Sequence, residues 1–90
     1  MTMINTVDLI LNKKLIYKHF SNIVDLTIRF EEDYEINECH FIFDIELNTA
    51  DTEKVLQENS NLIKDQMCFF ASDILFMMIT SFNLIEDDDE

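Results

Sequence analysis

Two stretches in the first half of the chain alternate between apolar and polar residues. The first is residues 22–30 (NIVDLTIRF), where the apolar set is Val24, Leu26, Ile28 and Phe30. The second is residues 38–48 (ECHFIFDIELN), where one set is Cys39, Phe41, Phe43, Ile45 and Leu47 and the opposite set is His40, Ile42, Asp44 and Glu46. Strict alternation predicts strands with one apolar face. The polar link over 31–38 contains no Asn-Gly or Asp-Gly turn, so we expect an antiparallel hairpin with a loop longer than two residues.

The segment before the hairpin spaces its apolar residues as a helix does. In residues 5–20, Val7, Leu11 and Leu15 recur every four positions, and Asn5 or Thr6 could cap the first turn. We favour a helix here. A pair of strands that turns at residues 12–13 remains the alternative.

The second half of the chain has a helical pattern from Thr49 onward. A seven-residue repeat runs through Leu56, Ile63, Phe70, Met77 and Leu84, with Met67 and Ile74 between its members. Asp51 or Thr49 can cap the start. Residues 58–61 (ENSN) could interrupt the pattern, so it predicts one long helix or two.

These patterns predict an α+β fold in one domain, residues 1–85, followed by an acidic tail, residues 86–90. An N-terminal helix and an antiparallel hairpin of two to three strands would pack against a long apolar C-terminal helix. The 90 residues contain no Gly and no Pro. This absence favours long helices, and any left-handed backbone position would have to use Asn or Asp.

Residues 67–82 (MCFFASDILFMMITSF) carry one charge, Asp73, and residues 67–85 reach the length of a bilayer helix. A central Asp costs about 2.5–3.5 kcal/mol on insertion. No basic cluster flanks the stretch. We therefore expect no membrane span.

Placed on a helix, residues 67–82 have two apolar sides. Leu75, Met78 and Phe82, with Cys68 and Ala71, would cover the hairpin. An apolar interface would remain on the side of Asp73, formed by Phe69, Asp73, Phe76 and Met77. Because one face suffices for a core of this size, we expect the second to bind another copy in a homodimer, or a partner protein.

The charge is concentrated after residue 30. The formal net charge is −13; residues 1–30 contribute +2 and residues 31–90 contribute −15. The total exceeds the magnitude of about 2–8 that is usual for a soluble domain of this size. A surface this acidic repels nucleic acid and anionic membranes and attracts basic protein surfaces.

The candidate partner-binding surface is acidic. Asp44 and Glu46 share one strand face, about 6–7 Å apart. The full set is Glu31, Glu32, Asp33, Glu35, Glu38, Asp44, Glu46, Asp51 and Glu53. One interpretation is that these carboxylates imitate nucleic-acid phosphates. The other is an ordinary solvated face.

The sequence offers no catalytic, cofactor or metal motif. Its soft ligands are His19, Cys39, His40 and Cys68, without the paired spacing of a zinc site. We expect no enzyme activity, no cofactor and no metal. The N-terminus lacks the pattern of a signal peptide, so we expect a cytoplasmic protein.

The combination of small size, extreme acidity and absent catalytic motifs resembles phage-encoded inhibitors, including anti-CRISPR proteins. The resemblance is one of type and carries no residue roles over. It implies a non-enzymatic inhibitor that occupies the basic, nucleic-acid-binding surface of a partner protein, such as a nucleic-acid-binding enzyme, without contacting nucleic acid itself. The alternative is a chaperone-like or scaffolding oligomer that binds a partner through its apolar helix. Strands followed by an apolar helix are similar to the SecB export chaperones, over the C-terminal half of this chain.

Overall fold

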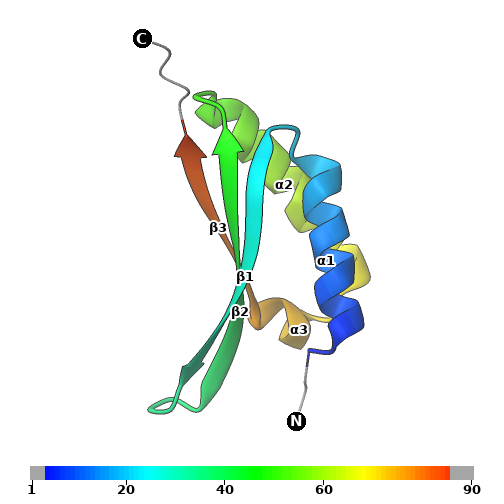
Figure 1. Cartoon of the computed structure of the whole chain (residues 1–90). Helices are drawn as coiled ribbons and strands as arrows, with labels where there is room; N and C mark the ends of the chain where they lie inside the picture. Colours follow the sequence, from blue (N-terminus) through cyan, green and yellow to red (C-terminus); the bar gives the residue numbers. More distant parts are fainter. Residues whose placement is uncertain (1–3, 86–90) are drawn as a thin grey trace.

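The computed structural model describes residues 4–85 as two layers, a three-stranded sheet with helices on one side (Figure 1). The elements in chain order are α1 (Thr6–His19), β1 (Ile23–Asp33), β2 (Glu38–Asn48), α2 (Thr52–Phe69), α3 (Ser72–Phe76) and β3 (Met78–Ile85). The strand order is β1-β2-β3, with β1 antiparallel and β3 parallel to β2. The α+β class is as predicted. The expected tail, residues 86–90, lies outside the described residues.

The N-terminal segment is a helix and not a pair of strands. Asn5 accepts a hydrogen bond from the Asp8 N–H at 2.9 Å, and the Asp8 carboxylate accepts one from the Asn5 N–H at 3.2 Å. This reciprocal cap satisfies two N–H groups that the first turn leaves without partners. The predicted apolar stripe is only partly buried, because Val7 is 69% exposed while Leu15 lies in the core.

The predicted hairpin is confirmed, and its second strand has the predicted bounds. The pairing places Phe30 opposite Phe41 and Ile28 opposite Phe43, on the face that the helices cover. Asn37 in the turn has φ 54°, so an Asn does take the left-handed position that Gly would usually occupy. The register shifts between Ile23 and Asp25.

That irregularity changes the predicted inner face of β1. Val24 lies between Ile23 and Asp25, whose partners Leu47 and Glu46 are adjacent on β2. It is 58% exposed, although simple alternation assigned it to the apolar face. A bulge of this kind adds one residue to a strand and thereby rotates the side chains before it relative to those after it.

The core lies between β2 and the two longer helices. Phe43, Ile45 and Leu47 on β2 are at most 1% exposed. They pack in one cluster with residues of both helices and of the chain that follows them, namely Leu15, Ile16, Phe20, Val55, Leu62, Phe70 and Met78. The rings of Phe20 and Phe82 are in contact, tilted by 52° with centroids 5.2 Å apart, which joins β3 to the end of α1.

The prediction of a long apolar C-terminal helix is wrong. The helix α2 ends at Phe69, Phe70 adopts an extended conformation, α3 has five residues, and β3 begins at Met78. A single helix over residues 52–85 would be about 51 Å long. An 11-residue strand such as β2 spans only about 36 Å. The end of such a helix would project beyond the sheet, and its apolar side chains would stay in water.

Residues 78–85 pair with β2 as a strand and thereby satisfy backbone groups of β2 that a helix in their place could not. Without β3, the outer edge of β2 would carry a row of N–H and C=O groups without protein partners. Exposure alternates over residues 78–83, and Met78, Thr80, Phe82 and Leu84 face the helix layer in the register of the sheet. Within residues 4–85, no helix is long and apolar enough to cross a bilayer.

Candidate functional site

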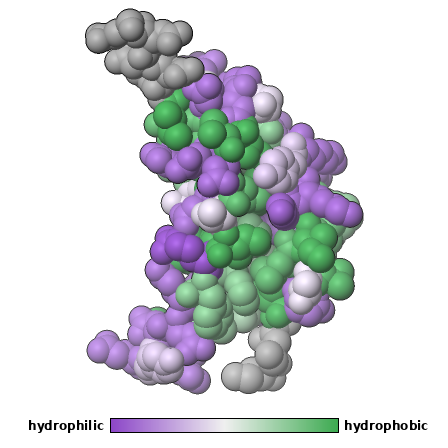
Figure 2. Space-filling view, viewed as in Figure 1, coloured by the Kyte–Doolittle hydropathy of each residue, from purple (hydrophilic) through white to green (hydrophobic). Residues whose placement is uncertain are grey.

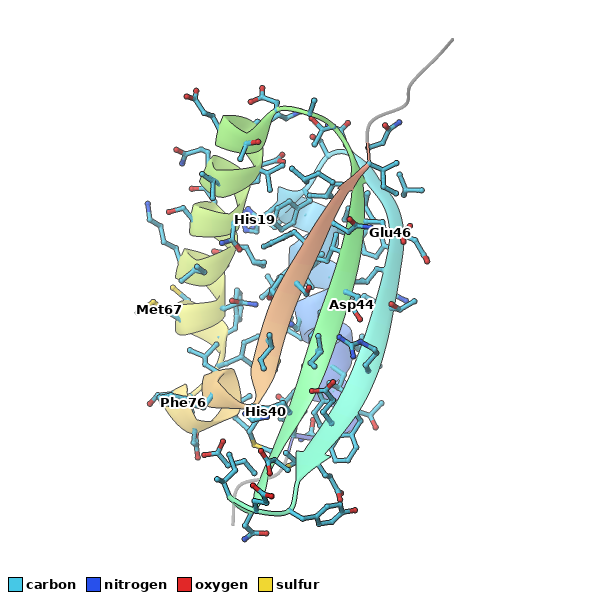
Figure 3. The ribbon with its side chains drawn as sticks, turned by 90° about the vertical axis from the view of Figure 1, so that its left-hand side faces the viewer. His19, His40, Asp44, Glu46, Met67 and Phe76 are labelled. Atoms are coloured by element: carbon cyan, nitrogen blue, oxygen red, sulfur yellow. The ribbon has the colours of Figure 1, made fainter. Side chains whose placement is uncertain are left out.

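One face of the sheet carries no helix among residues 4–85, and we call it the open face (Figures 1 and 3). In the strand register its residues form rows across the sheet. The upper rows are Asp25–Glu46–Asn83 and Thr27–Asp44–Ser81, the central row is Arg29–Ile42–Ile79, and the lower rows are Glu31–His40 and Asp33–Glu38. The described part of this face thus holds six carboxylates and one arginine.

Arg29 lies in the central row of the open face, on the edge strand β1, and neutralises part of the charge of that face. Its guanidinium donates hydrogen bonds to the Asp44 carboxylate and, at 3.1 Å, to Glu31. The hydrogen bond and charge of Asp44, followed by those of Glu31, raise the pKa of Arg29. Asp44 is therefore part of an exposed ion pair, and its charge is less available to a partner than its position suggests.

Negative charge that Arg29 does not neutralise remains in the row of Asp25 and Glu46. Asp25 lies directly opposite Glu46 across the β1–β2 pair, where like charges are unfavourable. Beside them the surface is hollowed by about 270 Å³, between Thr27, Asp44, Glu46, Ser81 and Asn83. The short side chains of Ser81 and Asn83 leave the carboxylates of Asp44 and Glu46 accessible from the side of β3.

A second acidic group lies at the tip of the hairpin, where both strands extend past the helices (Figure 1). A shallow hollow of about 510 Å³ is lined by Glu31, Glu32, Asp33, Tyr34, Glu35 and His40. Figure 2 shows this tip as hydrophilic, whereas hydrophobic residues gather on the lower part of the helix layer. The Glu32 carboxylate accepts a hydrogen bond from Tyr34 and raises the pKa of that phenol.

The structure separates the predicted acidic surface into two parts. The tip residues and the pair Asp44 and Glu46 share the hairpin, but Asp51 and Glu53 lie at the other end of β2, where α2 begins (Figure 1). Asp51 has a structural role there, because its carboxylate accepts a hydrogen bond from the Lys54 N–H at 3.1 Å as the cap of α2. The candidate site is therefore the hairpin without these two residues.

Asp25 belongs to the site although the sequence prediction omitted it. Its signal was its place among the polar residues of the first alternating stretch, in the same set as Thr27 and Arg29. The net charge of residues 1–30 is positive, so charge along the chain does not indicate an acidic site there. Only the strand register shows that it adjoins Glu46.

The predicted apolar interface is not a single helix face. Phe69 ends α2, Asp73 and Phe76 lie on α3, and Met77 links α3 to β3. Phe69 and Phe76 are 57% and 80% exposed, as predicted, while Met77 is half-buried. Of the residues assigned to the covering side, Met78 is buried and Leu75 and Phe82 pack on the core, but Cys68 and Ala71 are exposed.

An apolar hollow lies between α2 and α3, and Phe76 is the predicted interface residue that lines it. It measures about 370 Å³ and is lined by Ile63, Gln66, Met67, Ser72, Leu75 and Phe76. Met67 and Phe76 project on the side of α2 and α3 away from β1 (Figure 3). The sequence pattern placed Ile63 and Met67 in or beside the seven-residue repeat without assigning their burial, and the structure leaves both exposed.

The soft ligands do not gather. Among residues 4–85, no three His, Cys, Asp or Glu side chains are placed to hold a metal ion. Cys39 is half-buried and Cys68 is exposed, and both are free thiols. His19 bonds to Asp65, with Nε2 and Oδ2 2.6 Å apart, and thereby joins α1 to α2.

No protein-family model, curated protein or solved structure matches the chain.

Proposed function

We propose that the protein is a non-enzymatic binding protein that occupies the basic, nucleic-acid-binding surface of a partner protein. The observation that carries the proposal is the open face, with six carboxylates, one arginine and no covering helix among the described residues. Same-face side chains on a strand repeat every 6.6–6.8 Å or so. The carboxylates are thus presented in regular rows, as phosphates are on a nucleic-acid strand.

Electrostatic interactions would increase both the association rate with a basic partner and the selectivity for it. The formal net charge of −13 steers a basic surface toward the protein from a distance and repels nucleic acid itself. The sheet holds its carboxylates on a rigid support, so little conformational entropy is lost when they meet a partner. A protein of the phage-encoded anti-defence type would use these properties to inhibit a nucleic-acid-binding enzyme.

The test begins with capture of the partner from a lysate of the native host and its identification by mass spectrometry. The affinity of the purified partner is then measured between low and high salt. We expect binding to weaken steeply with salt and to compete with nucleic acid, because the interacting charges are screened. An affinity that does not change with salt would contradict the proposal.

Charge-reversal variants locate the surface. We expect Asp44→Lys with Glu46→Lys to abolish binding. The sharper comparison is Glu46→Lys against Glu53→Lys, which make the same change on the open face and in the first turn of α2, outside that face. Only the first should weaken binding strongly. Equal losses would mean that net charge matters and the open face does not.

A chaperone-like or scaffolding oligomer is the second candidate, favoured by the exposed apolar residues around the hollow between α2 and α3. In that case the apolar surface would bind a partner or a second copy in a homodimer. Phe69→Asp with Phe76→Asp should then abolish binding and leave a folded monomer. If the protein binds through its acids instead, this double variant keeps its salt-dependent affinity.

A further inference from the structure

The outer edge of β3 is built differently from the outer edge of β1. The eight residues of β3, MITSFNLI, contain no charge and no Pro. In contrast, β1 carries Asp25, Arg29, Glu31, Glu32 and Asp33, and its register shifts near Val24. Charges and bulges on an edge strand prevent pairing with another chain, and an uncharged regular edge permits it. The protection is on β1 and absent from β3.

The backbone groups that face this edge follow from the parallel ladder. The Phe41 N–H donates to the Met77 carbonyl at 2.7 Å, and Phe41 is the partner of Met78 in the register. In a parallel pair, alternate residues direct both backbone groups toward the same neighbour. The odd-numbered residues of β3 therefore bond to β2. The N–H and C=O groups of Thr80, Phe82 and Leu84 face the outer edge, and no strand among residues 4–85 pairs with them there.

The two faces of this edge have different chemistry. On the open face, an added strand would lie beside Ser81 and Asn83, about 9–10 Å from the backbone of β2, at two strand spacings. The hollow of about 270 Å³ over these small side chains leads to the carboxylates of Asp44 and Glu46. A lysine stem from the added strand can cross it and place its ammonium beside them.

The other face of the edge is apolar. Phe82 is half-buried, Leu84 is 37% exposed, and both lie on the side of the helix layer. In Figure 3, α2 lies laterally beyond β3, on the side opposite to β1. Its Ile63 and Met67 are 46% and 67% exposed and line the apolar hollow. Apolar side chains of an added strand would cover this surface.

We infer that β3 binds an extended peptide segment as a fourth strand, and that this segment alternates basic and apolar residues. The basic side chains reach Asp44 and Glu46 over the open face, and the apolar side chains pack toward α2. Main-chain hydrogen bonds supply affinity and the alternating side chains supply selectivity. The inference specifies that the basic partner presents an extended segment, and in that respect it rests on the proposed function. Its test uses synthetic peptides, however, and does not need the natural partner.

The experiment is hydrogen exchange of the full chain, followed by NMR, with an eight-residue peptide of alternating valine and lysine. At a peptide concentration about 100 times Kd, exchange at the Thr80, Phe82 and Leu84 amides should slow by up to about 100-fold. The amides of Ile79, Ser81 and Asn83, which already bond to β2, should change much less. Octalysine should bind the acidic face without protecting the outward amides, and a valine–glutamate peptide should not bind.

Two variants separate backbone pairing from charge. Thr80→Pro removes an outward N–H and leaves the β2 ladder intact, as Pro does on edge strands, and we expect it to weaken binding of the valine–lysine peptide at least tenfold. Asp44→Asn with Glu46→Gln should remove the preference for lysine over glutamine in the peptide without removing strand pairing. If Thr80→Pro does not fold, hydrogen exchange of the unchanged protein still tests whether the peptide pairs with the outer edge of β3.

Two results would overturn the inference. In one, the valine–lysine peptide binds while the three outward amides exchange as fast as before. In the other, these amides are already protected in the protein alone and sedimentation shows a dimer, so that a second copy occupies the edge. Neither result bears on salt-dependent binding of a folded basic partner. The proposed function can therefore fail or survive separately.

Discussion

At the scale of single residues, Asp65 is the carboxylate with the clearest structural role. It lies on α2 and accepts hydrogen bonds from two residues of α1, Lys18 at 3.1 Å and His19 at 2.6 Å. These bonds, that of His19 first, lower the pKa of Asp65 from its ordinary value of 3.8. Unlike the acids of the open face, Asp65 stabilises the contact between the two helices.

The lowered pKa makes part of the stability depend on pH. Because the folded pKa of Asp65 lies below its unfolded value, its contribution is complete above about pH 5 and is lost as the pH falls through the folded pKa. Asp65→Asn should therefore lower the Tm at neutral pH, and the difference from the unchanged protein should disappear in acid. Thermal unfolding from neutral pH to below 3.8 measures this difference. Glu53→Gln, an exposed carboxylate on α2, serves as control, and a difference for Asp65→Asn that is constant with pH would contradict the prediction.

At the scale of elements, a buried amide pair sets how α1 packs on α2. The Gln66 side chain, 8% exposed, donates a 2.8 Å hydrogen bond to the Oδ1 of Asn12, which is fully buried. The Nδ2 of Asn12 has no hydrogen-bond partner among residues 4–85. The contact therefore satisfies one donor and one acceptor but leaves a buried donor unpaired, which costs stability.

The cost can be measured by replacing one or both amides. Gln66→Leu alone leaves both polar atoms of Asn12 unpaired, and we expect the free energy of unfolding to fall by about 1–3 kcal/mol. Asn12→Leu with Gln66→Leu should recover most of this loss, because no buried polar group then remains at the contact. Urea unfolding of the three proteins tests both steps. A double variant that is no more stable than Gln66→Leu would show that the amide pair is needed for packing.

At the scale of the whole molecule, function and stability compete for the same charge. The carboxylates that would attract a basic partner repel one another across the open face, as Asp25 and Glu46 do. The formal net charge of −13 includes only six Lys and Arg residues, and Arg29 is the one that lies among these rows. A bound cationic partner would relieve the repulsion.

Salt should relieve it as well. Between about 0.01 M and 0.15 M salt the screening length falls from about 30 Å to about 8 Å, so repulsion between separate rows weakens. We expect the Tm to rise with sodium chloride over this range; a gain of about 1 kcal/mol corresponds to about 4–8 °C for a domain of this size. Asp25→Asn with Glu46→Gln should show a smaller rise. A Tm that is unchanged or falls with salt would mean that repulsion across the open face is negligible.

The sequence by itself determined the hairpin and most of the candidate site. Alternation is a local property, and Asp44 and Glu46 must share a face wherever the strand lies. The cap at Asn5 and the left-handed Asn37 are local in the same way. Local patterning could not show that Arg29 pairs with Asp44 or that Asp25 adjoins Glu46, because both relations depend on register. Nor did it separate Asp51 and Glu53 from the hairpin tip, which lies at the opposite end of β2.

Only the tertiary structure decided the secondary structure of residues 70–85. Phe70, Met77 and Leu84 fit a seven-residue helical repeat, while Met78, Thr80, Phe82 and Leu84 fit a strand, so the pattern supports both. The free edge of β2 selects the strand, since its N–H and C=O groups require partners that a helix cannot supply. The same choice created the uncharged outer edge of β3. That edge therefore exists because of pairing between segments far apart in the chain.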